Sequence, residues 1–524
     1  MRGSKGGCAM PMPSSDRALD VLVIGGGVNG LACAARLAAK GRKVTLVEAA
    51  PAVGGGAGER EFAPGYRAPA LAHLTQGLDA RMAEGMGLER HGLAFHPPLA
   101  TTVLAGVSDL LVVNGGNTSG PDTDAWAALH RKLADFARVL APFRQMRPVK
   151  LAGENRLFGL AKNGLGIRAL GKDDFRELLR MVLINAYDVA VDELTDDRLQ
   201  ALLSFDSTLG AWLGPRSPNS LILYLDRLSR GTDPLLPRGG MGALASALGR
   251  AAEAAGVKIR TNAPVERVLI EGDRAIGVRL AGGEDVRAAL VVSAMNPRTT
   301  FQKLVGAAAL DTGFFKAVGH IRSRGAAAKL HLALKGQPDF RGADLKSRIV
   351  IAPSAEAVER AFNPVKYGEV PDVPVMEVVL PSAHEGGMAP EGHHVLSAIV
   401  QYAPHDPKAG LEAARAEMLE NALAVLEAQS PGLRAMVAHA ELLMPQDIEA
   451  RFGMVGGNWH HGELAVEQML FNRPTFATSQ YATPLPGLWL AGAGSHPGGG
   501  VNGAAGWNAA QAILEARTMK GVGA

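Results

Sequence analysis

Apolar runs and glycine-rich turns alternate near the start of the chain. Residues 20–24 read DVLVI, a short apolar run typical of a strand buried on both faces. After the turn GGGVNG, residues 29–40 are rich in alanine and leucine and predict a helix. Residues 42–48 read RKVTLVE, which predicts a second strand that ends on an acid. We therefore expect this segment to fold as strand, glycine turn, helix and strand.

Comparable patterns return in the middle of the chain and near its end. The middle elements are expected to be a glycine turn and helix over 236–255, a strand at 257–261, a hairpin over 264–280 that turns at Gly272-Asp273, and a strand at 290–294. Toward the end, residues 486–491 predict a strand, and a glycine-rich loop then leads into a helix over about 502–516. These elements are expected to join the sheet that the first strand opens.

The intervening segments have a different pattern of predicted helices and strands, which predicts an inserted lobe. Helical stretches at 124–146 and 172–202 dominate the first segment, and strands such as 328–334 and 375–380 mix with helices in the second. The expected division is a disordered leader over 1–18, a discontinuous nucleotide-binding domain of 19–100, 235–298 and 446–524, and a substrate lobe of 101–234 and 299–445.

Composition narrows the function classes mainly by exclusion. The 54 basic and 51 acidic residues leave a formal charge of +3, with no dense Lys/Arg block, which argues against a nucleic-acid partner. No uninterrupted apolar run is long enough to predict a membrane-spanning helix. The two cysteines, Cys8 and Cys33, are too few for a disulfide framework, and Cys33 is expected to be a small core residue.

The first glycine turn has the spacing of a dinucleotide site. Gly25, Gly27 and Gly30 follow the GxGxxG pattern between a strand and a helix. The glycines permit a tight turn, a close approach of the pyrophosphate, and close packing of helix on strand. Glu48 ends the second strand, where an acid meets the ribose hydroxyls and disfavours a 2′-phosphate. The helix N-terminus supplies free N–H groups for the phosphates.

Two further glycine-rich elements favour FAD over NAD as the occupant. The run Gly54-Gly55-Gly56 follows the second strand, where a simple dehydrogenase enters its next helix. Near the C-terminal end, the loop GAGSHPGGGVNG leads into a helix whose N-terminus is expected to face the same crevice. A second nucleotide fingerprint and a CxxC or CxxxxC pair are both absent from the sequence, which disfavours the pyridine-nucleotide disulfide reductases.

Three segments of the chain resemble the FAD-dependent phytoene desaturase and amine oxidase superfamily, of the glutathione-reductase structural class. They read DVLVIGGGVNGLACAARLAAKGRKVTLVEAAPAVGGG, LPRGGMGALASAL with TNAPVERVLIEGDRAIGV, and GLWLAGAGSHPGGGVNGAAGWNAA. The strings SHPGGGVNGAAG and GGNWHHGELAVEQMLFNRP are similar to the phytoene-desaturase-like branch, which includes an animal pyridine nucleotide-disulfide oxidoreductase domain-containing protein 2. The resemblance implies an α/β fold, α+β overall, with a Rossmann-like FAD-binding domain and an inserted mixed substrate lobe.

The motifs and the resemblance together assign candidate site residues. The expected FAD contacts are Gly25, Gly27, Val28, Asn29, Gly30, Glu48, Gly54, Gly55, Gly56, Val265, Gly492, Ala493, Gly499, Gly500, Val501 and Asn502. His461 and His496 are the candidate catalytic residues, for orienting substrate or handling a proton, and the alternative is that each satisfies loop backbone groups. No metal site is expected, because the adjacent His460 and His461 lack one-faced ligand spacing.

The expected function is that of an FAD-dependent oxidoreductase acting on an apolar, polyene- or isoprenoid-like small molecule. Two alternatives stay open: an amine-oxidase-like flavin oxidase, and a flavoprotein with a mainly regulatory or structural role. Amine oxidases carry an arginine after the paired glycines, whereas Gly56 and Ala57 stand here. A cytoplasmic location is expected, with peripheral membrane contact and a mitochondrial location in a eukaryote left open. The oligomeric state and the electron acceptor are not indicated.

Overall fold

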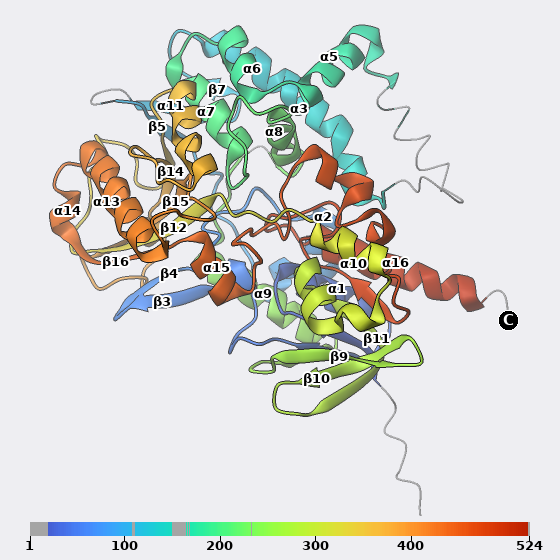
Figure 1. Cartoon of the computed structure of the whole chain (residues 1–524). Helices are drawn as coiled ribbons and strands as arrows, with labels where there is room; N and C mark the ends of the chain where they lie inside the picture. The colour runs from blue at the N-terminus through green and yellow to red at the C-terminus, as the bar shows by residue number, and fades with distance from the viewer. Residues whose placement is uncertain are drawn as a thin grey trace, which may run out of the picture.

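The chain folds around two large β-sheets, each with helices packed against it (Figure 1). The computed structural model describes residues 19–106, 110–148, 164, 166, 168–231 and 233–521. The predicted disordered leader over 1–18, with Cys8, lies outside the described residues. Parallel and antiparallel strands occur together, so the mixed α/β class predicted from the sequence is confirmed.

The first sheet has seven strands and carries the glycine turn. Its order is β8-β2-β1-β11-β10-β9, and β17 pairs with β11. The strands are β1 (Leu19–Ile24), β2 (Val44–Val47), β8 (Lys258–Arg260), β9 (Val265–Glu271), β10 (Arg274–Leu280), β11 (Asp285–Ser293) and β17 (Leu488–Leu490). The pairs β1–β2, β1–β11, β2–β8 and β11–β17 are parallel, so their carboxyl ends meet at one edge.

Three helices cover one face of the seven-stranded sheet, and they bury small apolar residues there. These helices are α1 (Val28–Ala39), α9 (Gly240–Ala254) and α16 (Ala504–Gly521). Alanines dominate their contact surfaces, so the helices approach closely and form one core with the sheet. Cys33 lies in this core and is fully buried, as predicted, and burial raises the pKa of its thiol to about 12.

The second sheet has eight strands, mostly antiparallel. Its order is β16-β12-β15-β14-β13-β5-β6-β7. The strands are β5 (Thr101–Leu104), β6 (Leu110–Asn114), β7 (Asn117–Thr118), β12 (Ala327–Leu334), β13 (Arg348–Ile351), β14 (Val375–Val379), β15 (His394–Gln401) and β16 (Val437–Leu443). Strand β12 is buried along its whole length because β15 and β16 flank it and both of its faces are covered.

Helices pack against the eight-stranded sheet through two apolar cores. One core holds α3 (Thr123–Gln145), α5 (Gly171–Leu183), α6 (Ala186–Glu193), α7 (Asp197–Thr208), α8 (Leu221–Leu228) and α11 (Ala355–Phe362). The other holds α13 (Leu411–Gln429) and α14 (Leu433–Met436). The remaining named elements are the β3–β4 ribbon (Glu59–Ala63, Tyr66–Pro69), α2 (Ala80–Met86), α10 (Thr312–Gly319), α12 (Pro381–His384) and α15 (Pro445–Phe452).

Most predicted elements occur, and the helical stretch predicted over 172–202 consists of three separate helices. It divides into α5, α6 and α7 because two polar residues start new helices inside it. The Asn185 side chain accepts from the amide of Asp188 at 2.8 Å, and the Asp196 carboxylate accepts from the amide of Arg198 at 2.9 Å. Strand β11 also begins earlier than the predicted 290–294, since β10 pairs with its first residues.

Candidate active site

One large cavity lies between the seven-stranded and eight-stranded sheets. Its volume is about 1450 Å³, above the roughly 300–1,000 Å³ of ordinary small-molecule pockets. Residues from both sheets line it, from Gly25 after β1 to Glu377 in β14 and Ile399 in β15. The cavity therefore has room for a large cofactor together with a second small molecule.

The first glycine turn forms one end of this cavity. Gly25 adopts φ of +98°, which favours glycine, and Gly27 precedes the first turn of α1. A Cβ placed on Gly27 would meet no atom within 4 Å, whereas one on Gly30 would lie 2.0 Å from the Gly25 carbonyl oxygen. Gly27 thus keeps space open toward the cavity, and Gly30 permits close packing of α1 on β1.

Glu48 is held in a fixed orientation beside this turn. Its carboxylate accepts from the backbone amide of Gly26 at 2.6 Å and from that of Ala50 at 2.9 Å. Each carboxylate oxygen retains further acceptor capacity, and Glu48 lines the cavity. The arrangement suits hydrogen bonds from two ribose hydroxyls.

The second glycine run lies directly against the first. The amide of Gly54 donates to the Gly26 carbonyl at 2.8 Å, and a short 3₁₀ helix follows at Gly55–Ala57. Gly54 has φ of +120°, and a Cβ there would lie 2.5 Å from the Ala245 side chain on α9. Two glycine backbones and the N-terminus of α1 therefore border the same space. The residues present fit a dinucleotide that carries a pyrophosphate.

The C-terminal glycine loop contributes only part of its predicted residues to the cavity. Ala493, Gly500 and Val501 line the cavity, whereas Gly492, Gly499 and Asn502 do not. The Asn502 side chain instead accepts from the amide of Ala504 at 2.8 Å and so caps the start of α16.

Gly499 and Gly492 make room for neighbouring chain rather than face the cavity. A Cβ on Gly499 would lie 2.3 Å from His460 Nδ1, and one on Gly492 would lie 2.5 Å from the Ala294 carbonyl oxygen. The other predicted cofactor residues line the cavity: Gly25, Gly27, Val28, Asn29, Gly30, Glu48, Gly54, Gly55, Gly56 and Val265.

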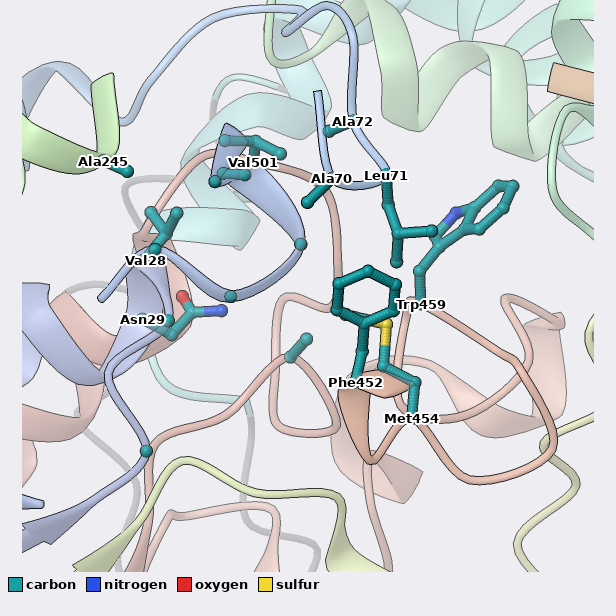
Figure 2. Close-up of a pocket in the computed structure, with 18 of the residues that line it drawn as sticks. Val28, Asn29, Ala70, Leu71, Ala72, Ala245, Phe452, Met454, Trp459 and Val501 are labelled. Carbon is teal, nitrogen blue, oxygen red and sulfur yellow. The ribbon is translucent and has the colours of Figure 1, made fainter. Parts of the chain in front are cut away.

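An apolar group faces the cavity beside this nucleotide end. Figure 2 shows Leu71, Phe452, Met454 and Trp459 gathered together, opposite Val28, Asn29 and Val501. A Cβ on Gly210, at the end of α7, would lie 2.2 Å from the Trp459 ring, so the indole lies directly against that backbone. The cavity wall here suits an apolar molecule.

Of the two histidines predicted to be catalytic, only His461 lines the cavity. His461 lines the cavity with φ of +58°, its buried Nδ1 has no hydrogen-bond partner among the residues that the structure describes, and burial lowers its pKa to about 4. His496 does not line the cavity; its Nε2 bonds the Phe143 carbonyl oxygen at 2.9 Å. His460 lines the cavity as well, and its Nε2 accepts from the Trp459 ring at 3.0 Å. All three rings are expected to be neutral at pH 7.

A buried charged cluster forms the wall of the cavity on the eight-stranded sheet. His73 Nε2 bonds the Glu377 carboxylate at 2.8 Å, and Lys329 Nζ lies 2.9 Å from His73 Nδ1. Burial lowers the pKa of His73 to about 4 and that of Lys329 to about 7. Although burial opposes ionisation of Glu377, Arg348 and His73 hold the pKa of its carboxyl well below its usual value.

The cluster continues through Arg348 to the helices. Arg348 donates to Glu377 through Nε and to Asp206 of α7 through both terminal nitrogens. Arg227 of α8 forms an ion pair with Asp206 at 3.1 Å. His73, Asp206, Arg227 and Glu377 all line the cavity. The wall opposite the sheet that carries the glycine turn is therefore strongly polar at this place.

Sequence reasoning missed this cluster. Its members come from a loop, from α7 and α8, and from β12, β13 and β14, so no local motif joins them. The one available signal was charge within apolar strands, as at Lys329 and Glu377. Among the described residues, no three His, Cys, Asp or Glu side chains gather as a metal site.

Comparison with known proteins places this geometry among flavoproteins. The profile of the family described as flavin containing amine oxidoreductase matches residues 29–514. Pyridine nucleotide-disulfide oxidoreductase domain-containing protein 2 of Rattus norvegicus is 29% identical, over 94% of this chain and 93% of its own length. The neurosporene-forming phytoene desaturase of Cereibacter sphaeroides is 26% identical, over 95% and 94% of the two chains.

Solved structures share the same fold at low sequence identity. An oxidoreductase from Methanosarcina mazei superimposes with a TM-score of 0.61 at 19% identity, covering 95% of this chain and 100% of its own. At this level of identity the likeness concerns the fold alone. Its coverage includes both sheets, so their joint arrangement is shared.

Proposed function

Because the chain belongs to the flavin containing amine oxidoreductase family and is an FAD-dependent oxidoreductase, we propose that it removes hydrogen from a largely apolar small molecule. The observation that carries the proposal is the apolar group of Leu71, Phe452, Met454 and Trp459 in the same cavity as the glycine turn. FAD, when bound, supplies a flavin N5 that accepts a hydride.

In this proposal the discontinuous segments 19–100, 235–298 and 446–524 bind FAD, and 101–234 with 299–445 form the substrate lobe. Gly27 and Gly54 admit the pyrophosphate, Glu48 accepts from the ribose, and Val265 borders the adenine end. The assignment is supported by the presence of all four residues in the lining of one cavity. His461 is the residue that we propose to orient substrate, since its ring lines the cavity.

Anaerobic half-reactions test the proposal directly. The purified protein is expected to be yellow, and mixing with a polyene should bleach the flavin absorbance without oxygen. Photoreduced protein should then be reoxidised by oxygen, a quinone or another acceptor. A protein that stays colourless after FAD titration would contradict the proposal, as would a bound flavin that no polyene reduces.

The amine-oxidase alternative rests on the family description and needs its own assay. Peroxide release with primary or secondary amines, together with no reduction of the flavin by polyenes, would favour this alternative. A regulatory role would be favoured if no acceptor reoxidises the photoreduced flavin. The same preparation therefore separates all three hypotheses.

We also propose peripheral membrane contact, through helix α5. Phe175, Leu179 and Leu183 follow i, i+4, i+8 spacing along one stripe, and they are 40%, 47% and 62% exposed. Exposed apolar stripes of this kind suit shallow insertion into a membrane interface. Within the described residues, no helix is both long and apolar enough to cross a membrane.

A further inference from the structure

The charged wall of the cavity is built by direct cross-strand neighbours. Lys329 on β12 pairs with Ile399 on β15, which pairs in turn with Glu377 on β14. Directly paired residues point to the same face of a sheet. Ile399 and Glu377 both line the cavity, so this row faces the space where a substrate would lie.

The cluster contains more basic than acidic side chains, so its charge balance depends on the protonation of Lys329. Arg348 donates from all three of its guanidinium nitrogens to Glu377 and Asp206. Among the described residues, Arg227 and Lys329 approach no carboxylate other than these two. With Lys329 protonated, three cations face two carboxylates. An uncompensated buried charge is costly, so an incoming anion would stabilise the cluster.

Arg227 is the cation that an incoming group can reach. It is 8% exposed, it lines the cavity, and within the described part of the chain its side chain pairs only with Asp206, through one nitrogen. A guanidinium carries five N–H donors, so most of those on Arg227 are left for a ligand. Bidentate geometry matches a carboxylate especially well.

Apolar side chains also line the cavity close to Arg227. Leu223 lies one helical turn earlier on α8 and, like Arg227, lines the cavity. Leu223 packs with Leu464, which also lines the cavity, and Leu209 at the end of α7 contributes a third leucine. A molecule bound here would therefore meet apolar side chains beside the charged wall that carries Arg227.

We propose that the substrate is an amphipathic carboxylate, with its acid group on Arg227 and its apolar body along the leucines and toward Trp459. The inference rests on the proposed function, which supplies the flavin end of the cavity. It specifies the largely apolar substrate of that proposal as a chain with one anionic terminus. When Lys329 is protonated, a single carboxylate charge also matches the single cation in excess, whereas a phosphate monoester brings about two charges.

Calorimetric titration of the FAD-loaded protein tests the inference without turnover. The probes are octanoate, 1-octanol, octylamine and octyl phosphate, which share one chain length and differ at the head. Octanoate is expected to bind at least about tenfold more tightly than the other three. Arg227→Met should weaken octanoate by about tenfold or more and leave 1-octanol unchanged. Asp206 keeps its bonds to Arg348, so this substitution orphans no carboxylate.

Two further variants keep the result interpretable. Arg238→Met removes an exposed arginine that does not line the cavity, and octanoate affinity should not change. If Arg227→Met does not retain FAD, Arg227→Lys replaces it; loss of the bidentate fork should still weaken octanoate but not 1-octanol.

Several outcomes would overturn the inference while the proposed function stands. These are equal affinities for octanoate and 1-octanol, no binding of any probe, tighter binding of octylamine or octyl phosphate, or octanoate binding that Arg227 variants leave unchanged. The proposed function fails separately, if the protein holds no FAD or if no polyene reduces the flavin. An octanoate site dependent on Arg227 would support the inference even if no polyene reduced the flavin, because calorimetry does not use turnover.

Discussion

Gly27 and Gly30 belong to one turn, yet their missing side chains serve different purposes. Gly27 has φ of −71°, which any residue adopts, and a Cβ there would enter open space in the cavity. Gly30 lies against the Gly25 carbonyl oxygen, where a Cβ would come within 2.0 Å. One glycine is therefore required by the ligand and the other by the fold.

This difference predicts opposite phenotypes for two alanine substitutions. Gly27→Ala should lower FAD content severalfold while the thermal midpoint of the apoprotein stays nearly unchanged. Gly30→Ala should destabilise the fold by about 1–3 kcal/mol through overpacking. The measurements are the flavin-to-protein absorbance ratio and the denaturant midpoint. Equal loss of stability in both variants would show that Gly27 is also needed for packing.

At the scale of elements, the two sides of the cavity differ in how well the sequence predicts them. The nucleotide end could be predicted because Gly25, Gly27, Gly30 and Glu48 lie in one contiguous strand–turn–helix–strand unit. The charged wall could not, since Lys329 meets Glu377 only through the register of β12, β15 and β14.

The FAD contacts predicted for the C-terminal glycine loop depend on the direction in which each loop residue points. The helix expected over about 502–516 occurs as α16, but the sequence does not reveal which loop residues face the cavity. Gly499 faces His460 and Asn502 caps α16, because the loop turns these positions away from the cavity. A glycine-rich string predicts a loop and leaves the direction of each residue to tertiary packing.

Arg473 links two loops at the cavity wall, and no carboxylate among the described residues pairs with it. Its guanidinium donates to the carbonyl oxygens of His460 at 2.6 Å and Ala493 at 3.0 Å, and both of these residues line the cavity. It also donates to Gly462 at 3.3 Å. The side chain is buried, and burial lowers the pKa of Arg473 to about 10. It therefore remains charged at pH 7 and holds the loops together.

Arg473→Lys is expected to loosen these loops. A lysine cannot reproduce the planar set of donors, so we expect a loss of about 2–4 kcal/mol and faster proteolysis near residues 458–464. Arg322→Lys is the matched control: Arg322 is half-exposed on Glu463 and Glu467, and its loss should cost below about 1 kcal/mol. Denaturant unfolding and limited proteolysis measure both. Equal effects would argue against the anchoring role.

Helix α5 yields a second prediction at the scale of elements. Leu179→Ser with Leu183→Ser should reduce cosedimentation with phosphatidylcholine–phosphatidylglycerol vesicles severalfold, because it removes most of the exposed stripe. Flavin content should not change, since these side chains do not line the cavity. Tyr367→Ser removes a single exposed apolar side chain elsewhere and serves as the control. Unchanged cosedimentation of the double variant would exclude α5 as the contact.

At the scale of the whole molecule, several buried histidines are neutral at pH 7, and two of them, His73 and His461, line the cavity between the sheets. Burial lowers the pKa of His73 and His461 to about 4 and that of His496 to about 3. An unfolded histidine has a pKa of about 6.5. Between pH 6.5 and 4 the unfolded chain therefore binds more protons than the folded one. The stability that these groups contribute is complete above pH 6.5 and is lost as the pH falls toward 4.

The protein should accordingly lose stability steeply between pH 6.5 and 4. His73 alone contributes about 3 kcal/mol to this loss, from its shift toward pH 4. Unfolding midpoints measured across this window should fall less steeply in His73→Gln, whose amide still bonds Glu377 but does not titrate. His320→Gln, at an exposed position, should leave the slope unchanged. If the unfolding midpoint of His73→Gln fell as steeply with pH as that of the unmodified protein, other groups would cause the acid sensitivity. The assignment of a neutral His73 between Lys329 and Glu377 would then be wrong.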